Sequence, residues 1–119
     1  MLNPFRTKEL ADRYAAYREN GGLDGPCVLC AAESIEEFTY WRIIPNEFPY
    51  DRVAAVHHMI VPKRHITDSE FSEDERNELM SIKHTRLQDY QYLLETTHVT
   101  KSVPAHFHLH LIVTKEIEC

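Results

Sequence analysis

The stretch His106-Phe107-His108-Leu109-His110-Leu111-Ile112-Val113 places three histidines at alternating positions in an otherwise apolar run. Successive side chains of a β-strand point to opposite faces, so the pattern predicts a strand with the histidines on one face and the apolar side chains on the other. Histidines two positions apart stand about 6.6 Å apart, twice the ~3.3 Å rise per residue, so each ring can hold a different part of one small ligand. Imidazole titrates near neutral pH, which suits nucleophilic, acid-base and metal-binding roles.

The alternating pattern leaves two chemistries open. The three rings can bind one metal ion together, as imidazoles at alternating strand positions are able to do. They can instead divide the steps of a group transfer among them. A lone histidine in such a strand is more often an ordinary packed residue, whereas three in register favour a functional site.

Composition limits the class of protein. The chain has 119 residues, 43% of them hydrophobic, which is enough for one domain with one modest core. A formal net charge of −6, from 13 Lys+Arg against 19 Asp+Glu, argues against a general binder of nucleic acid polymers or anionic membranes. No apolar run approaches the ~20 residues that cross a bilayer, and no secretory signal pattern opens the sequence. We therefore expect a soluble cytoplasmic protein.

Cys27 and Cys30 form a C-x-x-C pair, and Cys119 is the last residue. In a reducing compartment such a pair is a metal site or a redox dithiol. A thioredoxin-like dithiol begins a helix after a strand, whereas residues 23–30 are predicted to be a turn-rich loop, so zinc is favoured. The spacing excludes a compact zinc finger and leaves the other ligands open among the remaining histidines: His57, His58, His65, His98 and the three of the alternating run.

Periodicity and capping signals predict an α+β fold, an antiparallel sheet covered by helices. The expected elements are a helix over 7–19 capped by Thr7, a strand over 37–44, an irregular turn over 46–51, a strand over 53–61, a helix from the capping box Ser72-Glu75 to about Leu94, a loop over 96–105 and the histidine strand.

The segment 106–112 resembles the signature of the histidine triad (HIT) family, His-φ-His-φ-His-φ-φ with φ apolar. His57-His58-Met59-Ile60-Val61-Pro62-Lys63-Arg64-His65-Ile66 resembles the family's other hallmark, a histidine strand that runs into Val-Pro-Lys-Arg-His. With the cysteine pair upstream, the motifs span about residues 27–113. The resemblance implies a single HIT-like domain over 1–119, with a helical extension at 1–22 and the core at 23–113.

The resemblance also implies a nucleotide hydrolase or nucleotidyl-transferase that cleaves at an α-phosphate. His108 corresponds to the nucleophile, which would form a nucleotidyl-histidine intermediate. His110 would contact phosphate oxygens or the leaving group, and His57 would line the same pocket. The substrate would be a small nucleotide, either a dinucleoside polyphosphate or a nucleoside phosphoramidate.

In the zinc-bearing branch of the family, the matching ligands are Cys27, Cys30, His65 and His106. A structural zinc there would fix the His106 ring and stiffen the strand that presents His108. Homodimers are common in the family, so a homodimer is a further expectation.

Asn46-Glu47-Phe48-Pro49 resembles a nucleoside-contacting stretch of galactose-1-phosphate uridylyltransferases. Glu47 would accept the ribose hydroxyls and Phe48 would pack on the base; an ordinary turn with a packed Phe is the alternative. Those transferases carry Gln at the position of His110, which favours hydrolysis here. The family's Gly-Gln-Ser approach to the triad is missing, and Lys101 and Ser102 are the substitutes expected to contact phosphate.

Two other functions remain open. One is a metal-dependent hydrolase in which His106, His108 and His110 bind one catalytic ion that activates water. The other is a zinc-stabilised module that binds nucleotides without turning them over.

Overall fold

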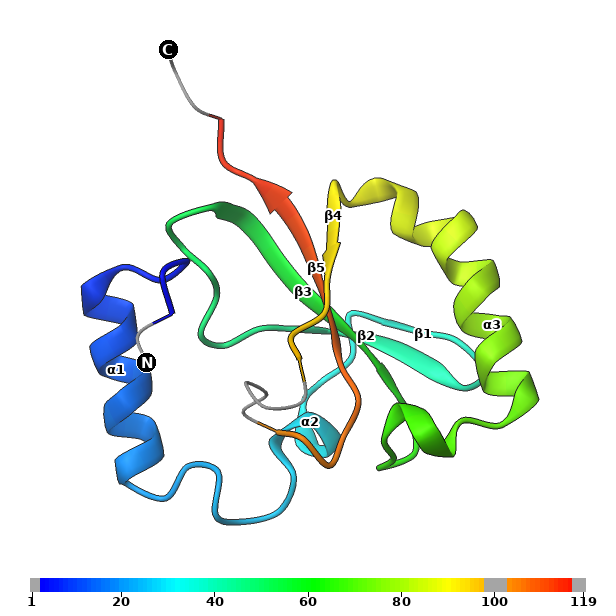
Figure 1. The fold of residues 1–119 in the computed structure, drawn as a ribbon, viewed down its shortest axis with the longest axis horizontal. Coiled ribbons are helices and arrows are strands. Elements are labelled where there is room, and N and C mark those ends of the chain that lie inside the picture. The colour runs from blue at the N-terminus through cyan, green and yellow to red at the C-terminus, as the bar shows by residue number, and fades with distance from the viewer. Residues whose placement is uncertain (1–2, 98–102, 117–119) are drawn as a thin grey trace.

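The computed structural model describes residues 3–97 and 103–116. Its centre is a five-stranded antiparallel sheet with the order β1-β2-β3-β5-β4 (Figure 1). The strands are β1 (Glu36–Glu37), β2 (Trp41–Pro45), β3 (Ala54–Pro62), β4 (Tyr92–Leu94) and β5 (Leu109–Thr114). The helices are α1 (Lys8–Glu19), α2 (Val28–Ala31) and α3 (Glu73–His84), with 3-10 turns η1 (Asp68–Glu70) and η2 (Arg86–Asp89). The predicted α+β class is confirmed.

The two faces of the sheet pack differently. Side chains on one face form the main apolar core with α3 and η2: Trp41, Ile43, Ile60, Leu79, Ile82, Leu87, Phe107, Leu109 and Leu111. On the opposite face a smaller cluster joins Leu29 of α2 to Ile44, Met59 and Val61. Strand alternation explains this split, because neighbouring residues of β2, β3 and β5 face opposite ways. The histidines of interest lie on the second face.

The strand predicted over 37–44 is wrong in its extent. The structure has a hairpin there, in which β1 pairs with β2 and the Phe38 N–H donates to the Trp41 carbonyl across the turn at 2.8 Å. The segment is rich in aromatic and β-branched residues, which favour strands and conceal a turn that lacks Gly, Pro or Asn.

The helix predicted from Ser72 to about Leu94 is correct only in its first half. The capping box is present, since the Ser72 side chain accepts from the Glu75 N–H and the Glu75 carboxylate accepts from the Ser72 N–H. The helix ends at His84, and residues 92–94 form β4 along β5. The apolar residues up to Leu94 fit the period of a helix. Pairing with β5 nevertheless supplies backbone hydrogen bonds to residues 92–94, and a local sequence pattern contains no information about them.

The predicted N-terminal helix is confirmed as α1, with Thr7 as N-cap. The Asp51 carboxylate accepts from the Thr7 N–H at 2.8 Å and from its hydroxyl at 2.7 Å, so it ties the start of α1 to the turn over 46–51. The pKa of Asp51 is lowered: burial by itself would raise it, and the hydrogen bonds from Thr7 outweigh that effect. None of the helices in the described ranges has the length and apolar character to cross a bilayer.

Candidate active site and metal centre

The three alternating histidines lie partly before β5 and partly in it. The ladder begins at Leu109, and the preceding segment lies beside residues that follow β3, since the Phe107 N–H donates to the Ile66 carbonyl at 2.8 Å. His106, His108 and His110 are 1%, 6% and 5% exposed. Buried imidazoles need hydrogen-bond partners for their ring nitrogens, and these partners differ among the three rings.

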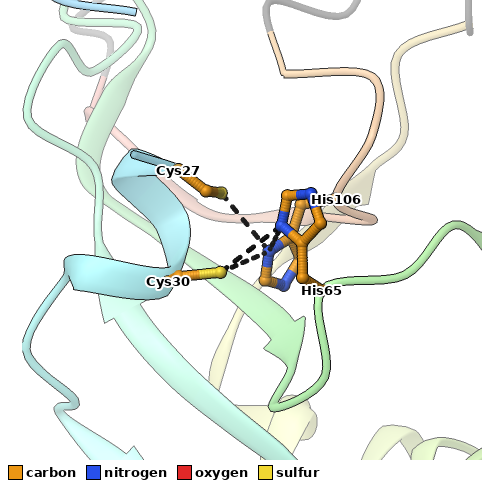
Figure 2. A group of neighbouring side chains, drawn as sticks. All are labelled: Cys27, Cys30, His65 and His106. Atoms are coloured by element: carbon orange, nitrogen blue, oxygen red, sulfur yellow. Dashed lines mark hydrogen bonds between the residues drawn. The ribbon is translucent and has the colours of Figure 1, made fainter. Parts of the chain in front are cut away.

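The first of these histidines joins the cysteine pair. Figure 2 shows the thiols of Cys27 and Cys30, from α2, directed at the rings of His65 and His106. One ligand atom from each residue falls within 4.8 Å of the others, so the four could hold a metal ion.

The distances between these atoms test the fit. The two Nδ1 atoms of His65 and His106 are 3.2 Å apart, and three of the four sulfur-to-Nδ1 distances are 3.3, 3.4 and 3.5 Å. In a tetrahedral zinc site, bonds of about 2.0–2.1 Å to nitrogen and about 2.3 Å to sulfur separate two nitrogens by about 3.3 Å and a nitrogen from a sulfur by about 3.5 Å. The donor atoms and their spacing fit a tetrahedral metal site.

The orientation of the His106 ring supports the same conclusion. Its Nε2 lies 3.0 Å from the Pro62 carbonyl oxygen, which can only accept, so Nε2 carries the proton and Nδ1 presents its lone pair to the thiols. Burial lowers the pKa of His106, which favours the neutral ring that a metal requires.

The loop predicted around the cysteine pair is wrong in one respect. Cys27 is the N-cap of the short helix α2, so the pair begins a helix, although turns and α1 precede it and not a strand. The argument from a loop context therefore does not separate zinc from a redox dithiol. The convergence of His65 and His106 on the two sulfurs favours a metal site over a dithiol, because a dithiol needs no such neighbours.

The third triad histidine pairs with His57. The Tyr50 backbone N–H donates to His57 Nδ1 at 3.0 Å, so the His57 proton is on Nε2, which lies 2.8 Å from His110 Nδ1. That bond makes His110 Nδ1 an acceptor and places the His110 proton on Nε2. Burial, then the charge of Arg6, lowers the pKa of His57 to about 4, which keeps the ring neutral at pH 7.

The central histidine has the opposite tautomer. His108 Nδ1 lies 3.1 Å from the His106 carbonyl oxygen and donates to it, so the lone pair of the ring is on Nε2. The rings of His108 and His110 meet edge to face with centroids 5.3 Å apart. His108 Nε2 therefore has a lone pair, and Nε2 of the neighbouring His110 ring carries a proton. A nucleophile needs the first and a donor group needs the second.

The sequence matches no family model and no curated protein. Solved structures do match. An HIT family hydrolase from Legionella pneumophila Philadelphia 1 is 22% identical, with a TM-score of 0.55 over 77% of this chain and 96% of that one. An HIT family hydrolase from Clostridium thermocellum is 22% identical, with a TM-score of 0.55 over 79% and 95%. A histidine triad protein from Clostridium difficile is 17% identical, with a TM-score of 0.54 over 78% and 94%. The chain has the histidine triad fold.

The three rings lie in different surroundings. Among the described residues, the group of possible metal ligands contains His106 but neither His108 nor His110. One ion shared by all three rings is therefore not supported by the geometry, since His110 Nδ1 faces His57 and His108 Nδ1 faces a carbonyl.

The predicted nucleoside contacts lie in the turn before β3, where Asn46 is next to His57. The Asn46 side chain accepts from the Phe48 N–H at 2.8 Å and directs its amide nitrogen at Met59 Sδ and His57, so it shapes the turn. Glu47 is exposed, and Phe48 packs against Tyr14 and Tyr17 of α1, at 4.8 and 5.0 Å between ring centroids. The expected phosphate contacts Lys101 and Ser102, and the candidate ligand His98, lie outside the described residues.

Two residues at the site were not found from the sequence. Tyr50 fixes the His57 tautomer through its backbone, and its ring packs on His57 and His110. Arg42 is 9% exposed and binds the end of α2. The sequence did contain a signal for Arg42, because it is a charged residue in the apolar run Trp41-Arg42-Ile43-Ile44. It contains no signal for Tyr50, because Tyr50 acts through its backbone N–H.

Proposed function

We propose that this protein is an HIT-type nucleotide hydrolase that cleaves at an α-phosphate through a nucleotidyl-histidine intermediate on His108. The observation that carries the proposal is the pair of opposite tautomers: a lone pair on His108 Nε2 beside a proton on His110 Nε2. The resemblance of the triad segment to the family signature supports it, as do fold neighbours described as HIT family hydrolases.

In the first step, the Nε2 lone pair of His108 attacks the α-phosphorus. An N–P bond forms, and the bond from phosphorus to the leaving group breaks. The leaving group departs with that electron pair, accepts a hydrogen bond from Nε2–H of the neutral His110 ring, and takes its proton from solvent. The chain from the Tyr50 N–H through His57 to His110 keeps this Nε2–H directed at the substrate. In the second step, water attacks phosphorus and gives up a proton to solvent, the N–P bond breaks with its electron pair returning to His108 Nε2, and the nucleotide is released.

The proposed metal is a structural zinc held by Cys27, Cys30, His65 and His106. Bound zinc would crosslink three separate segments and supply no chemistry on the substrate. The His106 ring binds at this centre, and the His106 carbonyl accepts the Nδ1–H of His108. The same residue therefore connects the metal centre to the tautomer of the nucleophile.

The nucleoside end is proposed to lie against the turn over 46–51. Glu47 is exposed and can accept the two ribose hydroxyls. Because Phe48 already contacts two tyrosines of α1, only its remaining face is available to a base. Under this proposal, α1, part of the proposed extension over 1–22, packs against the nucleoside side of the proposed core over 23–113. Lys101 and Ser102 remain the proposed phosphate contacts.

The decisive experiment traps the intermediate. The purified protein is mixed with an adenosine or guanosine 5′-phosphoramidate and with a dinucleoside polyphosphate. The reactions are stopped in denaturant at alkaline pH, because acid hydrolyses N–P bonds. Intact-mass measurement should show one added nucleotidyl group, and peptide mapping should place it on His108.

Variants separate the proposal from the alternatives. His108→Ala should lose the adduct and turnover but keep zinc, Cys27→Ser should lose zinc and stability, and the exposed His84→Ala should behave as wild type. Zinc loss with His108→Ala would favour the metal-dependent hydrolase. Nucleotide binding without adduct or turnover in the wild type would favour the binding module.

A homodimer through the outer edge of β4 belongs to the same proposal. In the described residues β4 pairs only with β5, and Tyr92 and Leu93 on it are 61% and 41% exposed. An unpaired strand edge with apolar side chains is a site for pairing with a second copy. Light scattering should give twice the chain mass, and Leu93→Lys should give the monomer mass; a monomeric wild type would contradict the dimer alone.

A further inference from the structure

Arg42 lies in β2 on the face of the sheet that carries the histidines. Its neighbours Trp41 and Ile43 belong to the core cluster beneath α3, so alternation directs Arg42 to the other side. There its side chain is 9% exposed. A buried guanidinium is costly unless its N–H groups are hydrogen-bonded, so its partners indicate its role.

Among the residues that the structure describes, the hydrogen-bond partners of the Arg42 side chain belong to α2 or to the residues just after it. Nη2 donates to the carbonyls of Leu29 and Cys30, the second at 3.1 Å. Nη1 donates to the carbonyl of Ala32 and to the Ser34 hydroxyl, the second at 3.1 Å. Three of these acceptors are carbonyls of the last turn of a helix, where no intrahelical N–H is available.

The helix α2 depends on such contacts. It has four residues, far below the ~12–15 residues at which an isolated helix becomes marginally stable in water. Its N-cap, Cys27, makes no capping hydrogen bond through its side chain, so Arg42 supplies the polar contacts that fix its orientation. No ion pair within 4.0 Å joins Arg42 to an Asp or Glu among residues 3–97 and 103–116, so the guanidinium is committed to the helix end.

We propose that Arg42 is a positioning residue for the metal centre: it holds the C-terminal carbonyls of α2 so that the thiols of Cys27 and Cys30 face His65 and His106 before a metal binds. This inference rests on the metal site of the proposed function. Preorganisation raises affinity because less ordering remains to be done on binding. Cys30 is the direct link, since its carbonyl contacts Arg42 and its sulfur lies 3.3 Å from His106 Nδ1.

The test measures Zn²⁺ affinity of the full chain by competition with a chromophoric chelator. The variants are Arg42→Gln, which is too short to reach both groups of carbonyls, and Arg42→Lys, which keeps the charge but not the fork. Arg86→Gln is the matched control, because Arg86 is a partly buried arginine that pairs with Glu36 and Asp89. We expect the dissociation constant of Zn²⁺ to rise about 10- to 100-fold with Arg42→Gln and less with Arg42→Lys, with no change for the control.

A second measurement distinguishes positioning from packing. The Tm of each metal-free variant and its increase on adding Zn²⁺ are compared. A positioning role predicts that Zn²⁺ raises the Tm of the Arg42 variants less than that of the wild type. An unchanged dissociation constant and an unchanged Zn²⁺-induced increase, even with a lower metal-free Tm, would overturn the inference.

Arg42→Lys keeps the test decisive if Arg42→Gln does not fold. A wild type that binds no Zn²⁺ would remove the proposed zinc itself. A wild type that binds Zn²⁺ while the folded Arg42 variants bind it equally well would remove only the role of Arg42. Trapping of the nucleotidyl group on His108 is scored separately and tests the catalytic proposal.

Discussion

The two faces of the central sheet differ in what their side chains do, although the same strands build both. The face under α3 is closely packed and apolar, with Ile60 of β3 and Leu111 of β5 fully buried. The other face, one residue away along each strand, carries His57 and His110 in a hydrogen-bonded network. Stability and chemistry are therefore divided by strand alternation, and substitutions on the two faces should have separable effects.

Two adjacent histidines of β3 show the difference between the two faces. His57 and His58 are neighbours on β3, yet His57 contacts the Tyr50 N–H and His110, whereas His58 Nδ1 lies 2.7 Å from the Tyr90 hydroxyl. The polar face tolerates burial because its ring nitrogens have partners. Among the described residues, Thr96 Oγ1 is the buried side-chain oxygen or nitrogen atom that lacks one.

The largest effect is expected from Leu111→Ala, on the apolar face. It should lower the free energy of unfolding by about 2–5 kcal/mol, because it leaves a cavity in a fully buried position. The folded variant should keep its zinc and its turnover. Urea denaturation and activity on a nucleoside phosphoramidate measure the two. Met80→Ala, at an exposed position, is the control, and lost zinc in folded Leu111→Ala would break the separation.

The next effect is expected from His57→Phe compared with His58→Phe. The first leaves the Tyr50 N–H and His110 Nδ1 without their partner, so kcat/KM should fall roughly 100-fold. The second loses one hydrogen bond to Tyr90, worth about 1 kcal/mol, and should keep turnover. Steady-state kinetics on both variants decides the matter. Equal losses of kcat/KM would show that the faces are not independent.

A smaller effect is expected from Glu75→Gln, which tests a link between the faces. Glu75 of α3 accepts two hydrogen bonds from Arg64, next to His65, and the pKa of Glu75 is lowered to about 2, first by Arg64; burial opposes the shift and bonds from Ser72 add to it. A lowered carboxyl pKa stabilises the fold above the ordinary pKa of about 4.5, and this contribution is lost as pH falls towards 2.

Urea denaturation between pH 7 and pH 2 measures this contribution. Glu75→Gln should lower the free energy of unfolding at pH 7 by about 1–3 kcal/mol and flatten its decline below pH 4.5. Glu73→Gln, an exposed carboxylate in the same helical turn, is the control. An unchanged decline in Glu75→Gln would assign the acid sensitivity to other groups.

The smallest effect concerns the titration of His57. NMR should find its pKa at about 4, and Arg6→Gln should raise that pKa because a nearby positive charge disappears. The sign for stability follows: the unfolded chain takes up a proton near pH 6.5 and the folded chain does not, so the fold loses stability as pH falls from about 6.5 to 4. A His57 pKa near 6.5 would mean that this ring is better hydrated than its burial indicates.

Much of the site could be predicted because the signals are local. The alternation around His106, His108 and His110 needs only the two-residue period of a strand, and Thr7 and Ser72 cap their helices through contacts within three residues. The resemblance then placed Cys27 and His65 with His106, and the structure brings them together.

What failed depends on strand pairing, which the types of neighbouring residues do not reveal. The composition of residues 37–44 is that of a single strand, but the segment folds back as a hairpin in which β1 pairs with β2. Residues 92–94 suit a helix or a strand equally, and the edge of β5 decides between them.

The amino-acid order by itself determined which residue types carry the chemistry and which face of each strand they occupy, because side-chain alternation is a property of neighbouring residues. Only the tertiary structure decided where the ring protons lie and that Arg42 holds the cysteine helix. Those outcomes depend on acceptors such as the Pro62 carbonyl and the Leu29 carbonyl, which reach their donors only when distant segments pack together.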